Sequence, residues 1–260
     1  MKVSVLGLGY VGLPLAAAIA KKTNNELVGF DPSKEKIKKV KNKECPIDDK
    51  QCAEDLKILD FPVSADDKII KNSDIYIVCV PTPVLDDFAP DLTPVKTAVR
   101  TVSKYLKKGQ ILVIESTINP GVCDEIIVPL LEEESGMKAG KDFDVAHCPE
   151  RINPGDPKWN VYNIPRNIGS TSKEATEKTA RFYRSFISGE INEMKDLKTT
   201  EATKIIENTF RDINIAFVNE LAKSFDVLDI DLVEVINGAS NKPFAFMAHF
   251  PSCGVGGHCI

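Results

Sequence analysis

The opening stretch of the chain, KVSVLGLGYVGLPLAAAIAKK, constrains the fold more than any other part of the sequence. A short run rich in valine and leucine leads directly into Gly7, Gly9 and Gly12, and a segment of helical character follows. A strand that turns into a helix through G-x-G-x-x-G is typical of a dinucleotide-binding βαβ unit. Glycine is common, so the pattern gains its weight from the strand and the helix on either side.

Each glycine of this turn has a separate predicted role. Gly7 permits the tight turn, Gly9 lets the backbone approach a pyrophosphate, and Gly12 lets the helix pack close to the strand. The helix N-terminus favours the negative charge of that pyrophosphate. Asp31 ends the next predicted strand and is expected to accept hydrogen bonds from the adenosine ribose. A carboxylate there repels a 2′-phosphate, so we predict NAD rather than NADP, a preference that nearby Lys36 weakens slightly.

Strand and helix signals alternate through the first half of the chain. Apolar strands are predicted within residues 2–8, 26–31, 74–83, 110–117 and 142–150. Helices are predicted within residues 10–22, 32–43, 93–109 and 120–136, the last with a possible kink at Pro129. Near-continuous apolar strands separated by helices indicate a parallel sheet that is covered on both faces.

The pattern changes after about residue 195. Residues 196–228 contain neither glycine nor proline, which predicts a helix longer than ~40 Å that links domains or subunits. A further helix is expected to end at Gly238. We therefore predict an α/β fold: a Rossmann-like, doubly wound, mostly parallel sheet in residues 1–195, then a long helix and the start of an all-α domain in residues 196–260.

Composition and charge exclude several classes of function. The net charge of −5 argues against nonspecific binding to nucleic acid or to an anionic membrane. The sequence has no apolar run of about 18 residues, so no transmembrane helix is expected. Seven cysteines without a CxxC pair are typical of free thiols in a reducing cytoplasm. The three histidines are too scattered to predict a metal site.

Polar side chains follow several predicted strands. Thr82 lies in VCVPTP, Ser116 and Thr117 lie in IESTINPG, and Glu150 and Arg151 lie in HCPERINPGD. Ligands of open α/β sheets bind at the carboxyl ends of the strands, so these residues are expected to face a cofactor or substrate. For Thr82, Ser116 and Thr117 the alternative is ordinary turn chemistry, because proline, serine and threonine are common in loops. For Glu150 and Arg151 the alternative is a surface Glu–Arg pair in a loop.

A polar stripe runs along the predicted long helix. Lys204, Asn208 and Arg211 follow one another at i, i+4 and i+7. Much of the remaining helix surface is apolar, so we expect the helix to be largely buried and the stripe to face a polar cavity. The apolar residues are Ile205, Ile206, Phe210, Ile213 and Phe217. A partly desolvated lysine can act as an acid or base there, whereas the alternative is a solvated helix face.

Cys259 lies in the glycine-rich segment GVGGHCI. Such a segment leaves room for a substrate, and the neighbouring His258 and backbone amides favour the thiolate form of the cysteine. Cys259 is therefore a candidate nucleophile. The alternative is a cysteine in a C-terminal tail.

Taken in order, the motifs GLGYVGLPLA, VCVPTP, ESTINPG, PERINPG, EATKIIENTFRDINIAFVNELA and GVGGHCI resemble one family across the whole chain. This is the UDP-glucose/GDP-mannose dehydrogenase family of NAD-dependent nucleotide-sugar 6-dehydrogenases. The segments ERINPGD and NKPFAFM are most similar to the branch that oxidises UDP-N-acetylglucosamine. The UDP-N-acetylmannosamine branch usually has a His-x-Arg pair where this chain has KPFAF, and UDP-glucose is a further alternative.

The resemblance implies a four-electron oxidation of a sugar C6 alcohol to a carboxylate, through a thiohemiacetal and a thioester on a cysteine. It assigns the nucleophile to Cys259 and the binding of the C6 oxygen to Lys204 and Asn208. It assigns the water and protons of the hydrolytic step to Glu150 and Thr117.

The resemblance also implies contacts with the cofactor and the sugar nucleotide. The cofactor contacts beyond the three glycines are Tyr10, Val11, Asp31, Thr82 and Thr117. The substrate contacts beyond Lys204 and Asn208 are Arg151, Ile152, Arg211 and Gly256.

The family further implies a homodimer formed through the long helix, residues 196–226. Its pattern continues after HCI with an Asp-Pro segment and a second α/β domain that binds the uridine nucleotide. This chain lacks that C-terminal UDP-binding domain, so we expect a fragment. Two alternatives stay open: a two-electron dehydrogenase of the hydroxyacid type, which needs no cysteine, and a catalytically silent NAD-binding fragment.

Overall fold

The computed structural model describes residues 1–152 and 158–254. The contacts within the chain separate two compact units, Met1–Ala202 and Thr203–Ile260. The boundary that the sequence predicts, between residues 195 and 196, stays a prediction.

The described residues of the first unit form an eight-stranded sheet in the order β3-β2-β1-β4-β5-β6-β7-β8. The strands are β1 (Lys2–Leu6), β2 (Glu26–Phe30), β3 (Val63–Ser64), β4 (Ile75–Val78), β5 (Ile111–Ile114), β6 (Asp144–His147), β7 (Arg166–Ser170) and β8 (Ile191–Glu193). All neighbouring strands pair in parallel except β6 and β7, which are antiparallel. The predicted Rossmann-like, mostly parallel sheet is confirmed.

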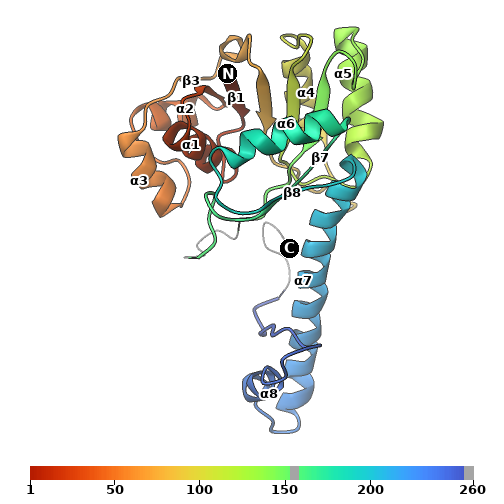
Figure 1. Cartoon of the computed structure of the whole chain (residues 1–260). Coiled ribbons are helices and arrows are strands. Elements are labelled where there is room, and N and C mark those ends of the chain that lie inside the picture. The colour runs from red at the N-terminus through yellow and green to blue at the C-terminus, as the bar shows by residue number, and fades with distance from the viewer. Residues whose placement is uncertain (153–157, 255–260) are drawn as a thin grey trace. The chain divides into compact units, whose positions relative to one another are not determined.

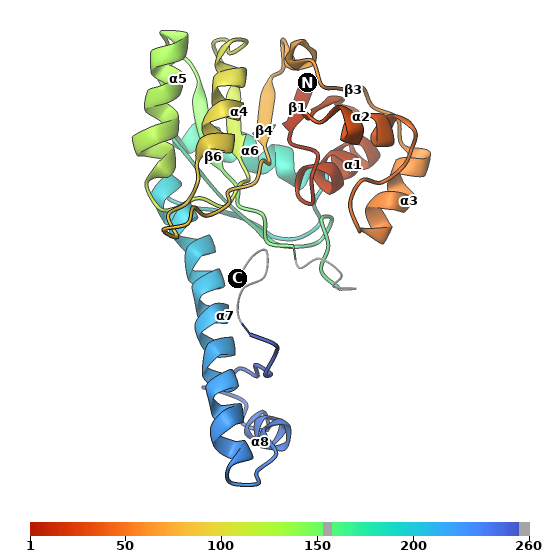
Figure 2. The same cartoon turned by 180° about the vertical axis from the view of Figure 1, so that it is seen from behind.

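Helices cover both faces of this sheet. They are α1 (Gly12–Lys22), α2 (Lys34–Lys41), α3 (Lys50–Ile58), α4 (Thr93–Ser103), α5 (Val128–Ser135) and α6 (Lys173–Arg184). Helix α6 crosses one face, and α4 and α5 lie on the opposite face, as the two views show (Figures 1 and 2). Two short helical turns are η1 (Asp67–Ile70) and η2 (Cys123–Ile127).

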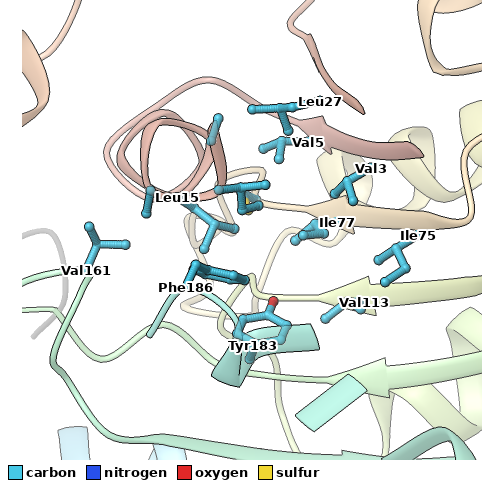
Figure 3. Packing of buried hydrophobic residues seen from close by; sticks show 14 of the residues in the cluster. Val3, Val5, Leu15, Leu27, Ile75, Ile77, Val113, Val161, Tyr183 and Phe186 are labelled. Carbon is cyan, nitrogen blue, oxygen red and sulfur yellow. The ribbon is translucent and has the colours of Figure 1, made fainter. Parts of the chain in front are cut away.

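The core lies on both sides of the strands. On one face, Val5 and Ile77 of the sheet pack with Leu15 of α1, with Tyr183 of α6 and with Phe186 just after α6 (Figure 3). The other face has its own cluster, formed with α4 and α5 and containing Leu6, Tyr76, Val78, Val99, Val102, Leu112, Ile114 and Leu131. Because both faces are buried, the central strands β4 and β5 are apolar at every position.

Several elements of the first unit were not predicted from the sequence. They are α3, β3, β7, α6 and β8. Helix α6 begins at the N-cap Ser172, whose side chain accepts a hydrogen bond from the Ala175 amide. The π-helical turn η2 directly precedes α5, and Pro129 lies in the first turn of α5, where a missing amide proton is tolerated. The predicted kink at Pro129 stays a prediction.

Helix α7 (Leu197–Asp226) has 30 residues, which corresponds to a length of about 45 Å. Helix α8 (Leu232–Ala239) follows, capped by Asp231 and ending one residue after the predicted Gly238. In the second unit, Val218 of α7 forms a small apolar cluster with Leu232 and Ile236 of α8.

The prediction that the long helix is largely buried is wrong for the described residues. Ile206, Phe210, Ile213 and Phe217 are 68%, 47%, 60% and 58% exposed. The small α7–α8 cluster covers Val218 and its neighbours but leaves this apolar stripe uncovered. No helix within the described residues combines the length and the apolar character that a membrane span requires.

Candidate active site

The carboxyl ends of five parallel strands lie in register along one edge of the sheet. Leu6 at the end of β1 pairs with Phe30 of β2 on one side and with Val78 of β4 on the other. Val78 pairs with Ile114 of β5, which pairs with His147 of β6. The strand order reverses between β1 and β4, and ligands of open α/β sheets bind at such a switch point. We call the loops that follow these five ends the strand-end loops.

In the glycine turn after β1, two positions must be glycine because the protein leaves no room for a Cβ atom, and a third has room for one. Gly7 has φ +92°, and a Cβ atom there would lie 2.7 Å from the Cys79 carbonyl oxygen. A Cβ atom at Gly12 would lie 1.9 Å from the Gly7 carbonyl oxygen. A Cβ atom at Gly9 would have no described atom within 4 Å. The space above Gly9 is therefore open to a ligand that approaches the backbone.

Helix α1 begins beside this open space. Its N-cap residue, Val11, provides no side-chain cap, and its first turn contains no acidic residue. The preceding Tyr10 is 52% exposed. With no side-chain cap and no acidic residue there, the positive end of the helix dipole favours an anionic group, so the turn fits the pyrophosphate of NAD.

Asp31, at the end of β2, connects the glycine turn to the second strand. It is 4% exposed, and its carboxylate accepts hydrogen bonds from the amides of Leu8 and Ser33, both at 2.9 Å. The Lys36 ammonium lies 3.3 Å from the same carboxylate. A carboxylate oxygen can accept more than one hydrogen bond, so Asp31 retains capacity for ribose hydroxyls.

Thr82 and Thr117 lie in the strand-end loops after β4 and β5, and both are half-buried. Between them, the Ser116 hydroxyl donates a hydrogen bond of 2.6 Å to the Val80 carbonyl oxygen and so ties the two loops together. The structure therefore brings both threonines to the same edge as the glycine turn, as the sequence predicts.

Glu150, Arg151 and Ile152 follow β6 at the same edge. The Glu150 carboxylate accepts a hydrogen bond from the Ile152 amide, and the Glu150 side chain is 13% exposed. The Arg151 guanidinium donates to the Pro165 carbonyl oxygen at 3.0 Å. These contacts give the segment a defined backbone turn around the carboxylate.

A buried charge cluster, which the sequence analysis missed, lies behind Glu150. We call Glu115, Glu150, Arg166 and Tyr183 the Arg166 cluster. The Arg166 Nη1 atom lies 3.5 Å from Glu115 and 3.8 Å from Glu150, and Arg166 and Glu115 are fully buried. The Tyr183 hydroxyl donates to Glu115 at 2.5 Å. The sequence offered only a weak signal, a single arginine at the start of the short segment RNIGS.

The pKa shifts of the cluster follow from burial and charge. Burial raises the pKa of Glu115, while Arg166 and the Tyr183 hydroxyl act in the opposite direction. Burial works against the charged form of Arg166, but Glu115 and then Glu150 outweigh it and raise the pKa of the guanidinium. Arg166 is therefore a permanent positive charge between two carboxylates.

The buried cysteines of the first unit are poor nucleophiles. Burial raises the pKa of the Cys52, Cys79, Cys123 and Cys148 thiols well above the ordinary value. At neutral pH such thiols stay protonated, and the thiolate is the reactive form. No group of three or more His, Cys, Asp or Glu side chains in the described residues is arranged to hold a metal ion.

The remaining predicted site residues belong to the second unit. On α7, Lys204 and Asn208 are half-buried and Arg211 is exposed. Gly256 and Cys259 lie outside the described residues. The convergence of these five residues on the strand-end loops stays a prediction.

Comparison with protein families gives two matches. Residues 1–187 match the NAD binding domain of the UDP-glucose/GDP-mannose dehydrogenase family. Residues 198–260 match the central domain of the same family.

Individual relatives cover the whole chain. It is 40% identical over 261 residues to the UDP-N-acetyl-D-glucosamine 6-dehydrogenase of Salmonella typhi, covering 100% of this chain and 60% of the relative. It is 39% identical over 265 residues to the UDP-N-acetyl-D-mannosamine dehydrogenase of Pyrococcus horikoshii, covering 100% and 62%. A solved structure of the UDP-D-ManNAc dehydrogenase from Pyrococcus horikoshii superposes with a TM-score of 0.93 at 38% identity, covering 100% of this chain and 62% of that one. The chain thus spans about three fifths of the length of these relatives.

Proposed function

We propose, from the premise that this chain belongs to the UDP-glucose/GDP-mannose dehydrogenase family, that the protein oxidises the C6 hydroxyl of a UDP-sugar to a carboxylate with NAD. The observation that carries the proposal is the open glycine turn at the edge where five strand ends lie in register. The relatives are named for UDP-N-acetylglucosamine or for UDP-N-acetylmannosamine. We propose UDP-N-acetylglucosamine as the substrate, because the chain has KPFAF where the mannosamine branch usually has His-x-Arg.

NAD, when bound, accepts a hydride from C6, and two NAD molecules in succession take the alcohol to the oxidation level of the acid. The pyrophosphate would be held by Gly9, Tyr10 and Val11 at the start of α1, where the protein leaves open space and an uncapped helix end. Asp31 would bind the adenosine ribose, with Lys36 beside it. The loop residues Thr82 and Thr117 would lie along the cofactor.

The aldehyde formed first must be trapped if one site is to complete both oxidations. We propose that the Cys259 thiolate adds to C6, so that a C–S bond forms and the aldehyde oxygen takes up a proton. Loss of the C6 hydride in the second oxidation, together with loss of the hydroxyl proton to solvent, leaves a thioester. Lys204 and Asn208 would bind the C6 oxygen and stabilise the charge that develops on it, and Arg151, Ile152, Arg211 and Gly256 would contact the substrate.

Hydrolysis of the thioester completes the reaction. Water adds to C6, the C–S bond breaks, and the thiolate leaves with its electron pair. Glu150 would accept the proton of the attacking water, with Thr117 beside it. The mostly buried carboxylate of Glu150, held by the Ile152 amide, supports this role.

We further propose a homodimer formed through residues 196–226 in a reducing cytoplasm. The exposed apolar stripe on α7 supports a partner surface, since side chains such as Ile206 and Ile213 are more than half exposed. The six cysteines among the described residues are all free thiols, which suits a reducing compartment.

A screen of UDP-sugars with the whole protein tests the substrate. UDP-N-acetylglucosamine is expected to yield the uronic acid with the highest kcat/KM, and preference for UDP-N-acetylmannosamine or UDP-glucose would overturn the choice of sugar. Calorimetry on the 260-residue chain separates the activity from the role of an NAD-binding fragment. Binding of NAD without any binding of UDP-sugar would identify this chain alone as such a fragment.

A further inference from the structure

We propose that Arg166 is a positioning residue for Glu150, itself held in place by Glu115 and Tyr183. The inference rests on the role in thioester hydrolysis proposed above for Glu150. It assigns a function to a buried charge that the reaction scheme does not otherwise use.

The topology explains how Arg166 reaches the active edge. Strand β7 runs antiparallel to β6, and His147 at the end of β6 pairs with Gly169. Arg166 precedes Gly169 in β7, so it extends beyond the end of β6, toward the loop that carries Glu150. Because β7 runs antiparallel to β6, its first residue, Arg166, lies at the edge where the parallel strands end.

The contacts around Arg166 are arranged in sequence from the interior outward. Glu115 is fully buried and is fixed by the Tyr183 hydroxyl at 2.5 Å. Arg166 is fully buried and lies 3.5 Å from Glu115. Glu150, at 3.8 Å from the same guanidinium nitrogen, is the partly exposed member. The order predicts that the inner pair fixes the guanidinium and the guanidinium fixes Glu150.

The distances indicate that Arg166 acts on Glu150 through charge, whereas the Ile152 amide supplies the hydrogen bond to that carboxylate. Both separations exceed the ordinary hydrogen-bond range, and Arg166 Nε and Nη2 have no hydrogen-bond partner in the described part of the chain. A buried ion pair adds little to stability, because desolvation offsets the attraction. What the arrangement provides is a fixed positive charge behind the carboxylate that handles water.

A second buried cluster in the same unit offers a matched control. Asp55 is 2% exposed and pairs with Lys21 at 2.5 Å, and the Tyr162 hydroxyl donates to it at 2.5 Å. It shares a buried carboxylate, a cation and a tyrosine hydroxyl with the Arg166 cluster, but it has one carboxylate instead of two and its lysine is partly exposed. A purely structural role for Arg166 predicts that disrupting either cluster has the same kind of effect.

The experiment compares four variants of the whole protein: Arg166→Gln, Arg166→Lys, Glu150→Gln and Asp55→Asn. NADH formed in the first turnover is measured by stopped flow, steady-state acid formation by product assay, and covalent sugar on the protein by intact mass spectrometry. Glu150→Gln is expected to keep the first-turnover burst and accumulate the thioester. Arg166→Gln is expected to do the same, with steady-state turnover at least ~10-fold slower than wild type.

The conservative variant and the control variant distinguish positioning from a purely structural role, because a purely structural defect would not cause the thioester to accumulate. Arg166→Lys keeps the charge on a shorter reach, so it should accumulate an intermediate amount of thioester, with turnover reduced about threefold. Should Arg166→Gln fail to fold, Arg166→Lys decides the matter. Asp55→Asn should melt at a lower temperature and show no thioester.

The outcomes separate the two proposals. A thioester in Glu150→Gln together with none in either Arg166 variant overturns the inference about Arg166 alone. No thioester in Glu150→Gln, from a protein whose wild type produces acid, overturns the role of Glu150 and the inference with it. Arg166 variants that lose burst and turnover in equal proportion likewise overturn the positioning role.

Discussion

Two alanine substitutions in the glycine turn separate folding from cofactor binding. At Gly12 the new Cβ atom would lie 1.9 Å from the Gly7 carbonyl oxygen, so the helix or the turn must shift by more than an ångström. Overpacking of this kind destabilises a protein by about 3 kcal/mol. For a domain of this size, that corresponds to a fall in Tm of roughly 6–12 °C.

At Gly9 the new Cβ atom would meet no described atom within 4 Å, and Gly9 is not among the residues with positive φ. Gly9→Ala should therefore change the free energy of unfolding by less than ~0.5 kcal/mol. The added methyl group would occupy the space that the pyrophosphate needs. We expect at least ~10-fold weaker NAD binding, or about 1.4 kcal/mol.

The assay is thermal melting and calorimetric titration with NAD, both on the 260-residue chain. Gly12→Ala should lower the Tm, and Gly9→Ala should lower the NAD affinity at an unchanged Tm. Wild-type NAD affinity in Gly9→Ala would refute the reasoning, because a ligand that approaches the backbone there could not tolerate the methyl group.

Three further predictions address the thiol, pH and assembly. Cys259→Ser should abolish acid formation in the whole protein while NAD affinity stays within about twofold, measured by product assay and calorimetry. Undiminished acid formation would contradict the assignment of Cys259 as the nucleophile. Burial lowers the pKa of His147 to about 3, below its unfolded value of 6.5, so the unfolded state takes up a proton first and stability should fall as the pH drops from 6.5 toward 3. The slope of the unfolding free energy against pH approaches ~1.4 kcal/mol per pH unit. Denaturant melts of His147→Gln should show a flatter pH dependence, and an unchanged slope would contradict His147 as its source. Phe217→Asp, on the exposed stripe of α7, should convert a dimer to a monomer in sedimentation velocity, while Val227→Asp, also exposed, should not. The same oligomeric state in both variants would argue against the stripe as the dimer interface.

The sequence predicted those parts of the fold that depend on local signals. The step from β1 to α1 follows from glycine spacing, and the four other strands that precede site residues, β2, β4, β5 and β6, are short and largely apolar. The strand ends follow from these runs, so Asp31, Thr82, Thr117 and Glu150 could be expected along one edge before any geometry was known.

The parts that depend on distant contacts could not be predicted. Strand β7 contains an arginine and a glycine, and its role depends on pairing with β6 in the opposite direction. Helix α6 buries threonines and small residues that resemble a polar surface in the sequence. Arg166 is interpretable only once Glu115 and Glu150 are known to flank it.

The exposure of α7 has a different cause. Its apolar stripe led to the prediction of burial, but periodicity does not specify what would cover such a stripe. Phe210 and Phe217 stay about half exposed in the described residues, so the prediction of burial failed there.

The amount of NADH formed for each molecule of acid, measured with the whole protein and its preferred UDP-sugar, tests the central claim most directly. A protein that captures the aldehyde on sulfur and oxidises it again yields two NADH per uronic acid, with no free aldehyde. One NADH per sugar, with a released aldehyde or ketone as the product, would contradict it and identify a two-electron dehydrogenase.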